Sequence, residues 1–298
     1  MMLLSRAATA VNGELIGQDS PFTAVSKDSR DIDAGSLYVA IRGERYDGHA
    51  FVAQAQAAGA AGALVSEQQQ LDLPQIRVAD TRLALGALAA YWRQQYNGKI
   101  VGITGSNGKT SVKEMTRSIL EQAAGAEHVL STAGNLNNDI GMPITLLRLR
   151  EQHRFGVIEM GANHPGEIDY LTHIAQPHVA VINNAGPAHL EGFGSIEKVA
   201  SSKAEIYSGI VHGGTAVINA DDDYADYWRG VCAQLGNDKK VITFSMQDAS
   251  ADLYASLLDA GSTTAIELKA PGGTGVVQLA VPGRHNVMNA LAAAAVTS

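Results

Sequence analysis

A short glycine-rich segment carries residues whose types and spacing suit phosphate chemistry. The run GITGSNGKTS covers residues 102–111 and lies between an apolar stretch and a stretch with helical spacing. Glycines let the backbone approach a phosphate closely, and the amides at a helix N-terminus point toward such an anion. Lys109 would then reach the terminal phosphates, and the Thr110 hydroxyl would complete a Mg²⁺ shell. We therefore predict a nucleotide-phosphate site made of Gly105, Ser106, Asn107, Gly108, Lys109, Thr110 and Ser111.

The glycine spacing differs from the common phosphate-binding loop, in which four residues separate two glycines. Here two residues separate Gly105 from Gly108, and five separate Gly102 from Gly108. An ordinary glycine turn between a strand and a helix is the alternative. It leaves Lys109 unexplained, because a cation at the positive end of a helix costs stability unless an anion is bound.

A carboxylate at another strand end could complete a metal site. Residues 155–160 read FGVIEM, so Glu159 stands at the end of an apolar strand, where ligands bind in α/β sheets. Its oxygens are of the kind that Mg²⁺ prefers. The alternative is an ordinary strand-end glutamate.

The elements that must position these residues alternate between strands and helices. Strands are expected at residues 99–104, 155–160, 178–183, 215–219 and 240–244. A helix from residue 111 has Val112, Met115 and Ile119 on one face, and residues 284–296 form a last helix. The pattern predicts an α/β fold whose P-loop-type central domain has a mainly parallel sheet flanked by helices. Residues 251–281 alternate in polarity and look like a small antiparallel addition.

The first eighty residues read as a separate, small α/β domain. Short strands are expected at residues 36–41 and 63–65, a loop at 43–48 and an alanine-rich helix at 49–58. A helix at 81–96 follows and is interrupted by Asn97-Gly98. We predict a first domain at residues 1–80, a helical linker at 81–98 and a central domain at 99–298.

Composition narrows the class of protein. The 298 residues suit about two domains, and 46% hydrophobic with 17% charged residues suits globular cores. The net charge of −8 disfavours a broad nucleic-acid surface. The one cysteine, Cys232, cannot form an intrachain disulfide, and no stretch reads as a signal peptide or membrane span. We expect a cytoplasmic monomer without membrane insertion.

Several segments resemble segments of the Mur ligase family, and they follow one another along the chain in the family's order. The loop TGSNGKT is similar to the family's shortened loop, which accounts for the glycine spacing. Residues 26–48 resemble the family's uridine-nucleotide domain. Matching segments in the central region are TAGNLNNDIGMP at 132–143, EMGANHPGEI at 159–168, NNAGPAHLEGFGSIEKVASSKAEI at 183–206 and PGRHNVMN at 282–289.

The resemblance implies an ATP-dependent ligase in peptidoglycan precursor synthesis. ATP would phosphorylate the terminal carboxylate of a UDP-linked muramoyl peptide, and an amine would attack the acyl phosphate. Among the family members, the one that joins D-alanyl-D-alanine to UDP-N-acetylmuramoyl tripeptide is most similar in three segments: GNLNNDIG, EMGANHPGEI and PAHLEGFGS. The resemblance implies a third, C-terminal domain after the last helix, and we expect this chain to lack it. We therefore expect little ligase activity from this chain alone.

The sequence alone leaves three other functions to consider. One is another Mur-type amide ligase, including one that adds glutamate to folate, against which residues 26–48 argue. Another is a non-catalytic fragment that binds the nucleotide or the UDP precursor. A nucleotide-switch or transport protein would need four-residue glycine spacing and an Asn-Lys-x-Asp motif, and the sequence has neither.

The resemblance also implies roles around the reacting centre. Glu159 would hold one Mg²⁺ with Thr110, and His189 would help hold a second. Lys203 matches a lysine that the family carbamylates into a metal-binding anion; taken alone, it reads as a solvated lysine on a helix face. Asn138 would contact the substrate or phosphate, so Lys109, Asn138, His189 and Lys203 form the predicted catalytic set.

The remaining roles concern the substrates. Asn135 and Asn137 would orient a carboxylate or phosphate, with plain turn chemistry as the alternative. Asn286 would contact the adenine or ribose, or else cap the last helix. The uridine-diphosphate site would contain Ser29, Arg30, Arg45 and Asp47, for which surface salt bridges are the alternative.

Overall fold

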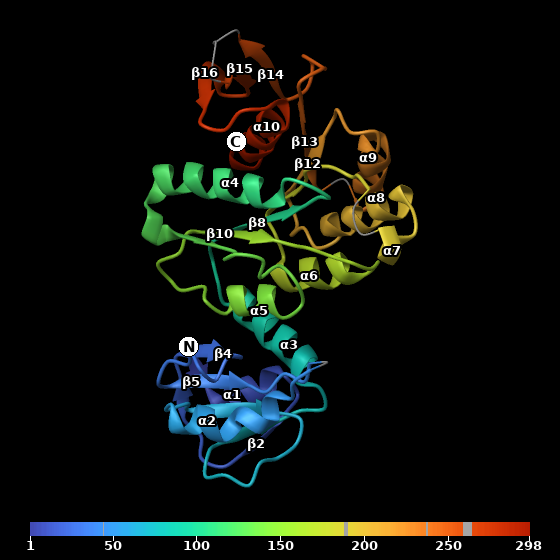
Figure 1. Ribbon diagram of the computed structural model, residues 1–298. Coiled ribbons are helices and arrows are strands. Elements are labelled where there is room, and N and C mark those ends of the chain that lie inside the picture. The colour runs from blue at the N-terminus through green and yellow to red at the C-terminus, as the bar shows by residue number, and fades with distance from the viewer. Residues whose placement is uncertain (44, 188–189, 237, 259–263) are drawn as a thin grey trace. The chain divides into compact units, whose positions relative to one another are not determined.

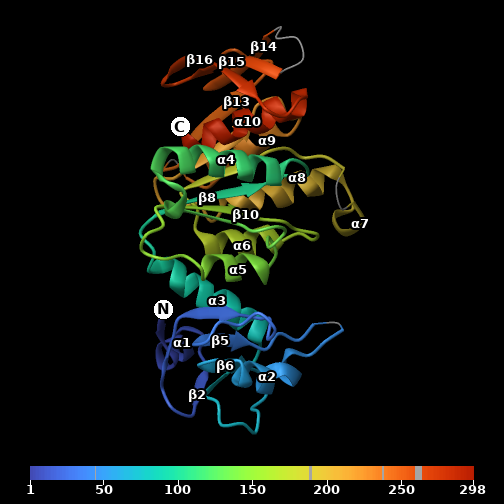
Figure 2. The ribbon, with the colours of Figure 1, turned by 60° about the vertical axis from the view of Figure 1, so that its left-hand side comes forward.

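The computed structural model describes residues 1–298 except 44, 188–189, 237 and 259–263. The chain forms two compact units (Figures 1 and 2). The first contains Met1–Tyr96 with Asp139–Leu149, and the second contains Asn97–Asn138 with Arg150–Ser298. The first unit thus includes most of the segment expected as a linker, together with a short insertion from the segment expected as central domain. In the described part of the chain, no helix combines the length and apolarity that a membrane crossing needs.

The first unit is built on a five-stranded sheet of order β2-β7-β6-β5-β4. Its strands are β2 (Glu14–Ile16), β4 (Ala24–Ser26), β5 (Ser36–Val39), β6 (Gly62–Val65) and β7 (Gln75–Arg77). Strands β4 to β7 are parallel, and β2 is antiparallel at one edge. A separate antiparallel pair joins β1 (Met2–Leu3) to β3 (Pro21–Phe22). The helices of this unit are α1 (Leu4–Ala10), α2 (Val52–Ala57), α3 (Thr81–Gln94) and α5 (Gly141–Leu146), and α5 packs on α3.

Residues 48–57 differ from the single helix expected at 49–58. A 3-10 turn, η1 (Gly48–Phe51), precedes α2. The Asp47 carboxylate accepts a hydrogen bond from His49 N at 3.0 Å and lies 2.6 Å from His49 Nδ1. Local side-chain bonds of this kind compete with the regular helical pattern. They explain why the α-helix begins only at Val52.

The second unit contains a nine-stranded sheet of order β16-β15-β14-β13-β12-β11-β8-β10-β9. Strands β8 to β14 pair with one another in parallel, and β15 and β16 are added to the β14 edge in antiparallel pairing. The expected mainly parallel sheet is therefore confirmed, and the antiparallel addition continues the same sheet. The strands are β8 (Lys99–Thr104), β9 (Val129–Ser131), β10 (Phe155–Glu159), β11 (Val179–Ile182), β12 (Thr215–Asn219), β13 (Lys240–Ser245), β14 (Leu253–Leu258), β15 (Thr264–Ala270) and β16 (Gly273–Leu279).

Helices cover both faces of this sheet. On one face, α4 (Lys109–Ala124) and α10 (Arg284–Thr297) pack against each other and against the strands (Figure 1). On the other lie α6 (Glu167–Ala175), α8 (Ile196–Ala204) and α9 (Ala225–Gln234). Short elements complete the unit: η2 (Ala126–His128), α7 (Leu190–Phe193) and η3 (Glu205–Tyr207). The carboxyl ends of the parallel strands meet at one edge, where α/β sheets bind ligands.

Helix α4 begins at Lys109, two residues before the expected start, and its buried face differs from the expected one. Val112 is fully buried, but Ile119 is 40% exposed. Lys113 takes a core position instead, because its Nζ donates to the carbonyl of Thr132 at 2.9 Å. Met115 and Ile119 line an apolar pocket of about 690 Å³ between α4, α10 and strands β15 and β16.

A buried tryptophan joins α9 to α8. Trp228 is fully buried, and its Nε1 donates to the Ala200 carbonyl at 3.1 Å. We predict that Trp228→Phe lowers the free energy of unfolding by about 1–3 kcal/mol, because it removes this buried hydrogen bond and leaves a small cavity. Urea unfolding followed by circular dichroism measures the change. Tyr227→Phe, at an exposed neighbour, is the control and should change little. Equal stabilities for Trp228→Phe and the wild type would contradict this role.

Candidate functional site

The glycine loop after β8 has backbone geometry that only glycine adopts easily. Gly105 and Gly108 have φ of 152° and 77°. A Cβ at Gly108 would lie 2.4 Å from Asn289 Oδ1 and 2.6 Å from Asn183 Nδ2. Gly108 is also the N-cap of α4, so no side chain caps the first amides of that helix. The loop therefore presents backbone N–H groups at a helix N-terminus, which is the geometry of an anion site.

Lys109 folds back over this loop. Its Nζ donates to the carbonyl of Gly105 at 2.7 Å and to that of Ser106 at 3.3 Å. Burial lowers the pKa of Lys109, and the nearby charge of Glu159 partly opposes the shift. Two carbonyl oxygens are weaker partners for an ammonium than phosphate oxygens would be. Lys109 is thus a cation whose present partners a phosphate could replace.

Asparagines that the sequence analysis did not single out hold the loop in place. The side chain of Asn184 accepts from Asn107 N at 2.9 Å and donates to Asn107 O at 3.0 Å. Asn183 Nδ2 also donates to Asn107 O and to Asn289 Oδ1, both at 2.9 Å. Their position directly after β11 was the available signal, because ligand-positioning residues collect at strand ends.

Glu159 is the centre of a polar cluster beside the loop. It ends β10, is 2% exposed, and its Oε2 accepts from Thr110 Oγ1 at 3.2 Å. Its Oε1 accepts from Asn137 Nδ2 at 2.7 Å. The Glu159 N–H donates to Thr132 Oγ1 at 3.0 Å, and the Thr132 carbonyl accepts from Lys113. The Thr110 hydroxyl and Glu159 carboxylate are adjacent hard oxygens, a donor set that suits Mg²⁺.

A site in which protein side chains alone hold a metal ion would need several ligands close together. Within the described residues, no group of three or more His, Cys, Asp or Glu side chains is suitably arranged. Mg²⁺ does not require one, because it commonly keeps waters and phosphate oxygens as ligands. His189, the predicted ligand of a second ion, lies outside the described residues.

Lys203 is deeply buried, so the solvated alternative is wrong. It lies on α8, is 2% exposed, and its Nζ stands 5.5 Å from the centre of the Phe193 ring. Burial, followed by the charge of Lys109, lowers the pKa of Lys203 to about 8, although Glu205 and Glu167 oppose the shift. The Glu205 carboxylate is already engaged by the backbone N–H groups of Gly166 and Asp169. A buried lysine with a lowered pKa is a candidate functional group, because it is more nucleophilic at neutral pH.

The remaining predicted residues of the second unit differ in burial: Ser106 is buried, and Ser111 and Asn286 are half-buried. Asn135 and Asn138 are exposed, and the Asn135 carbonyl accepts from Asn137 N at 2.8 Å. Ser106 Oγ donates to Gly186 O at 3.1 Å, which ties the loop to the segment after β11. Ser111 and Asn286 both line the apolar pocket beside α4.

Asn286 is not the cap of α10. Gly283 occupies the N-cap position, and Asn286 lies within the first turn, where its Nδ2 donates to Pro282 O at 2.8 Å. Its Oδ1 accepts from Asn289 Nδ2 at 3.2 Å. Asn286 is therefore linked through Asn289 and Asn183 to the glycine loop.

The first unit contains a pocket of about 860 Å³ lined by basic and aromatic side chains. Of the four residues predicted to bind uridine diphosphate, Ser29, Arg30 and Arg45 line it. Ser29 Oγ donates to Gln54 Oε1 at 3.0 Å, and Arg30 forms an exposed ion pair with Asp28 at 2.7 Å. Asp28 holds the pKa of Arg30 above its usual value. Other lining residues are Lys27, Asp28, Tyr38, Ile41, Gly43, Tyr46, Gly48, Phe51, Gln54 and Ile140.

Asp47 does not line this pocket in the described part of the chain. Its carboxylate is used within the loop, by His49 and by Arg42 Nε at 3.0 Å. Hydrogen bonds from His49 are the largest causes that lower the pKa of Asp47 to about 2. The salt-bridge alternative thus describes Asp47 and Arg30, whereas Arg45 is exposed and lines the pocket.

Comparisons with known proteins agree with these features. A family model described as "Mur ligase middle domain" matches residues 103–297, and one described as "Mur ligase family, catalytic domain" matches residues 21–93. The UDP-N-acetylmuramoyl-tripeptide–D-alanyl-D-alanine ligase of Escherichia coli is 48% identical over 99% of this chain and 64% of its own length. The Bacillus subtilis protein of the same name is 35% identical over 91% of this chain and 57% of its own length.

Solved structures give the same result. MurF from Acinetobacter baumannii has a TM-score of 0.88 and 39% identity, over 98% of this chain and 63% of its own. MurF from Thermotoga maritima in complex with ADP has a TM-score of 0.77 and 28% identity, over 91% of this chain and 61% of its own. The chain spans about three fifths of the length of these relatives. Since a Mur ligase model matches most of the sequence and the fold agrees, the chain belongs to the Mur ligase family.

Proposed function

We propose that the chain binds ATP in its second unit and a UDP-linked muramoyl peptide in its first, as parts of a ligase that adds D-alanyl-D-alanine to UDP-N-acetylmuramoyl tripeptide. One observation carries the nucleotide site: Thr110 and Glu159 meet at 3.2 Å beside the glycine loop and Lys109. The E. coli and A. baumannii relatives support the choice of substrates, because their names specify that reaction.

The reaction requires two displacements. A carboxylate oxygen of the tripeptide attacks the γ-phosphorus of ATP, the bond to ADP breaks, and an acyl phosphate forms. The amine of D-alanyl-D-alanine then attacks the acyl carbon, loses a proton, and displaces inorganic phosphate as the amide forms. The first step brings two anions together, and the second places negative charge on the acyl oxygen and the leaving phosphate. Groups that offset negative charge are therefore needed.

The chain's own residues supply these groups. The loop amides and Lys109 bind and orient the phosphates, and Lys109 leaves the carbonyls of Gly105 and Ser106 to do so. Thr110 and Glu159 would hold Mg²⁺, which offsets charge on the phosphates when bound. Asn137 keeps the Glu159 carboxylate oriented, and Asn135 and Asn138, on the same exposed segment, contact the substrate. Asn286 contacts the adenine or ribose.

Lys203 is proposed to react with carbon dioxide. Its neutral amine would add to CO₂, form an N–C bond and release a proton, which gives a carbamate. The lowered pKa of Lys203 supports this, because the neutral form is substantial near pH 8. The carbamate, with His189, would provide oxygen and nitrogen ligands for a second Mg²⁺.

The cytoplasmic location and the monomeric state also stay predictions.

Calorimetry tests the substrate proposal. We expect UDP-N-acetylmuramoyl tripeptide to bind the chain more tightly than the UDP sugar without peptide, and folate not to bind. Arg45→Ala should weaken UDP-ligand binding by about tenfold. A hydrogen bond to a charged group contributes about 1.5–3 kcal/mol, and a tenfold change in Kd corresponds to about 1.4 kcal/mol. Absence of binding by any UDP ligand would contradict the role of the first unit.

A substitution of Glu159 tests the metal site. We predict that Glu159→Gln weakens Mg²⁺-dependent binding of a non-hydrolysable ATP analogue by about tenfold or more, because a neutral amide is a poorer Mg²⁺ ligand. Binding in EDTA should be unchanged. Glu127→Gln, at an exposed position of the same unit, is the control. The same Mg²⁺ dependence in Glu159→Gln and wild type would rule out Glu159 as a ligand.

Carbon-13 NMR with labelled bicarbonate tests Lys203. The carbamate signal should rise as pH increases through about 8, since the amine loses its proton there, and should fall below that pH. It should vanish in Lys203→Met and persist in Lys198→Met, an exposed lysine of the same helix. A signal that survives Lys203→Met would refute the assignment.

A further inference from the structure

One wall of the pocket in the first unit is a single loop. Its residues Gly43, Arg45, Tyr46 and Gly48 line the pocket. Tyr46 is 73% exposed, so its side chain has little packing to fix it. Gly43 N donates to Tyr46 O and Gly48 N donates to Ile41 O, both at 2.9 Å. These bonds close the loop on itself but do not attach its tip to the sheet.

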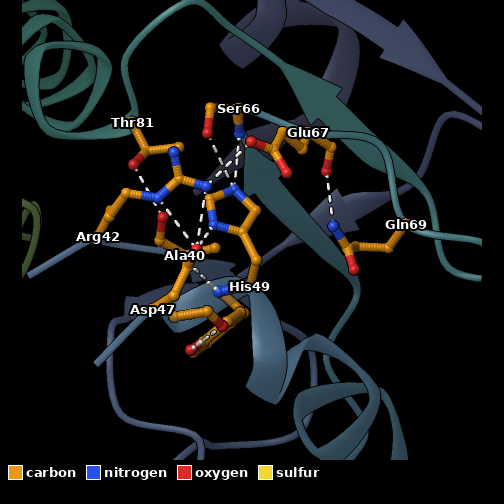
Figure 3. Close-up of polar contacts among 10 residues, drawn as sticks. Ala40, Arg42, Asp47, His49, Ser66, Glu67, Gln69 and Thr81 are labelled. Carbon is orange, nitrogen blue, oxygen red and sulfur yellow. Dashed lines mark hydrogen bonds and ion pairs between the residues drawn. The ribbon is translucent and has the colours of Figure 1, made fainter. Parts of the chain in front are cut away.

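The attachment to the sheet lies behind the loop, at His49. Its Nδ1 is 2.6 Å from Asp47 Oδ1, and its Nε2 accepts from Ser66 N at 2.9 Å (Figure 3). Ser66 directly follows β6, the central strand of the sheet. None of these three residues lines the pocket in the described part of the chain. The contact therefore supports the wall without touching a ligand.

The hydrogen bonds determine the protonation of the ring. A backbone N–H can only donate, so Nε2 must carry a lone pair, and the proton must lie on Nδ1, where it donates to Asp47. His49 is thus neutral. The order Asp47, His49, Ser66 resembles a nucleophile triad, and Ser66 Oγ is 3.1 Å from Nε2. The backbone amide already occupies that lone pair, however, and the ring is only 7% exposed. Positioning, not proton transfer, fits this arrangement.

A second attachment is weaker. Arg42 Nε donates to Asp47 Oδ2 and Arg42 Nη2 to Glu67 Oε1, both at 3.0 Å. Both partners of the Arg42–Glu67 pair are more than half exposed, and exposed pairs contribute little. The buried Tyr38 of β5 also attaches the loop, because its hydroxyl donates to Gly48 O at 3.0 Å. The bonds of His49 and Tyr38 therefore carry most of the attachment, and those of His49 are the ones that reach β6.

We propose that His49 is a positioning residue for the UDP-ligand pocket: it bonds the loop of Arg45 and Tyr46 to the end of β6. The proposal rests on the proposed function of that pocket. A loop already fixed in its bound conformation loses less entropy when a ligand arrives, so binding is tighter. The effect should appear in affinity for the UDP ligand, not in nucleotide binding by the second unit.

Two amide substitutions separate the two bonds of the ring. The side-chain oxygen of Gln reaches about as far as Nε2 and can accept from Ser66 N, whereas Asn reaches only about as far as Nδ1. We expect His49→Gln to bind UDP-N-acetylmuramoyl tripeptide within about threefold of wild type. His49→Asn and His49→Phe should bind it about tenfold more weakly. Ser66→Ala keeps the backbone N–H and should bind within about twofold of wild type.

Each variant is measured by calorimetry with the UDP ligand and, separately, with a non-hydrolysable ATP analogue, whose affinity should not change. Hydrogen exchange without ligand provides the second measurement. Exchange at Ser66 and at residues 45–48 should be faster in His49→Asn and His49→Phe than in His49→Gln, with β5 unaffected.

Wild-type affinity and wild-type exchange in His49→Phe would overturn the proposal, and so would equal losses in His49→Gln and His49→Phe. A loss of ATP-analogue binding together with the UDP ligand would overturn it as well, because it would indicate general destabilisation. Failure of the wild type to bind any UDP ligand would contradict the proposed function of the pocket, whereas the exchange measurement would still test the attachment.

Discussion

The buried carboxylate of Glu159 is the interaction on which the arrangement of the second unit's site depends. A charge that is 2% exposed is costly unless hydrogen bonds or counter-charges compensate it. Its partners come from separate segments: Thr110 from the start of α4 and Asn137 from the segment after β9. The same segment supplies Thr132, which accepts from Glu159 N and binds the buried Lys113. One strand-end residue thus holds the glycine loop's helix and the asparagine segment together. A metal ion bound there would strengthen an organisation already present.

Much of this could be predicted from local sequence. The apolar strands and the glycine loop follow from periodicity and from residues that tolerate unusual φ, and the mainly parallel sheet follows from their alternation. Glu159 could be recognised because a carboxylate at a strand end is conspicuous. The burial of Lys203 and Lys113 could not, because lysine spacing on a helix is the same whether the face is solvated or covered. Only the packed helices and strands show that both lysines lie inside, and only then does a lowered pKa for Lys203 follow.

The asparagines and Asp47 show a second limit of sequence reasoning. Asn183, Asn184 and Asn289 reach the loop from β11 and α10, across separations that no local pattern reveals. Asp47 stands among pocket residues in the sequence, yet it bonds His49 and Arg42 behind the loop. Glu159 and Lys203 are buried, but Lys109, Thr110, Arg30 and Arg45 would touch ligands from exposed or weakly held positions. Buried asparagines, Glu159 and a neutral His49 hold the backbone that carries these groups. This division is physically reasonable, since a site must be both accessible and preorganised.

The most direct test of the nucleotide site is a crystal structure of the chain with a non-hydrolysable ATP analogue and Mn²⁺ in place of Mg²⁺. The account predicts phosphate oxygens on the amides of the glycine loop and Lys109 Nζ moved from the Gly105 carbonyl to a phosphate. It also predicts an anomalous Mn²⁺ signal within coordination distance, about 2.0–2.3 Å, of the Thr110 hydroxyl, with Glu159 bound directly or through one water. A nucleotide bound elsewhere would contradict it. So would an analogue on the loop with Lys109 still on its carbonyls and no metal near Thr110 and Glu159.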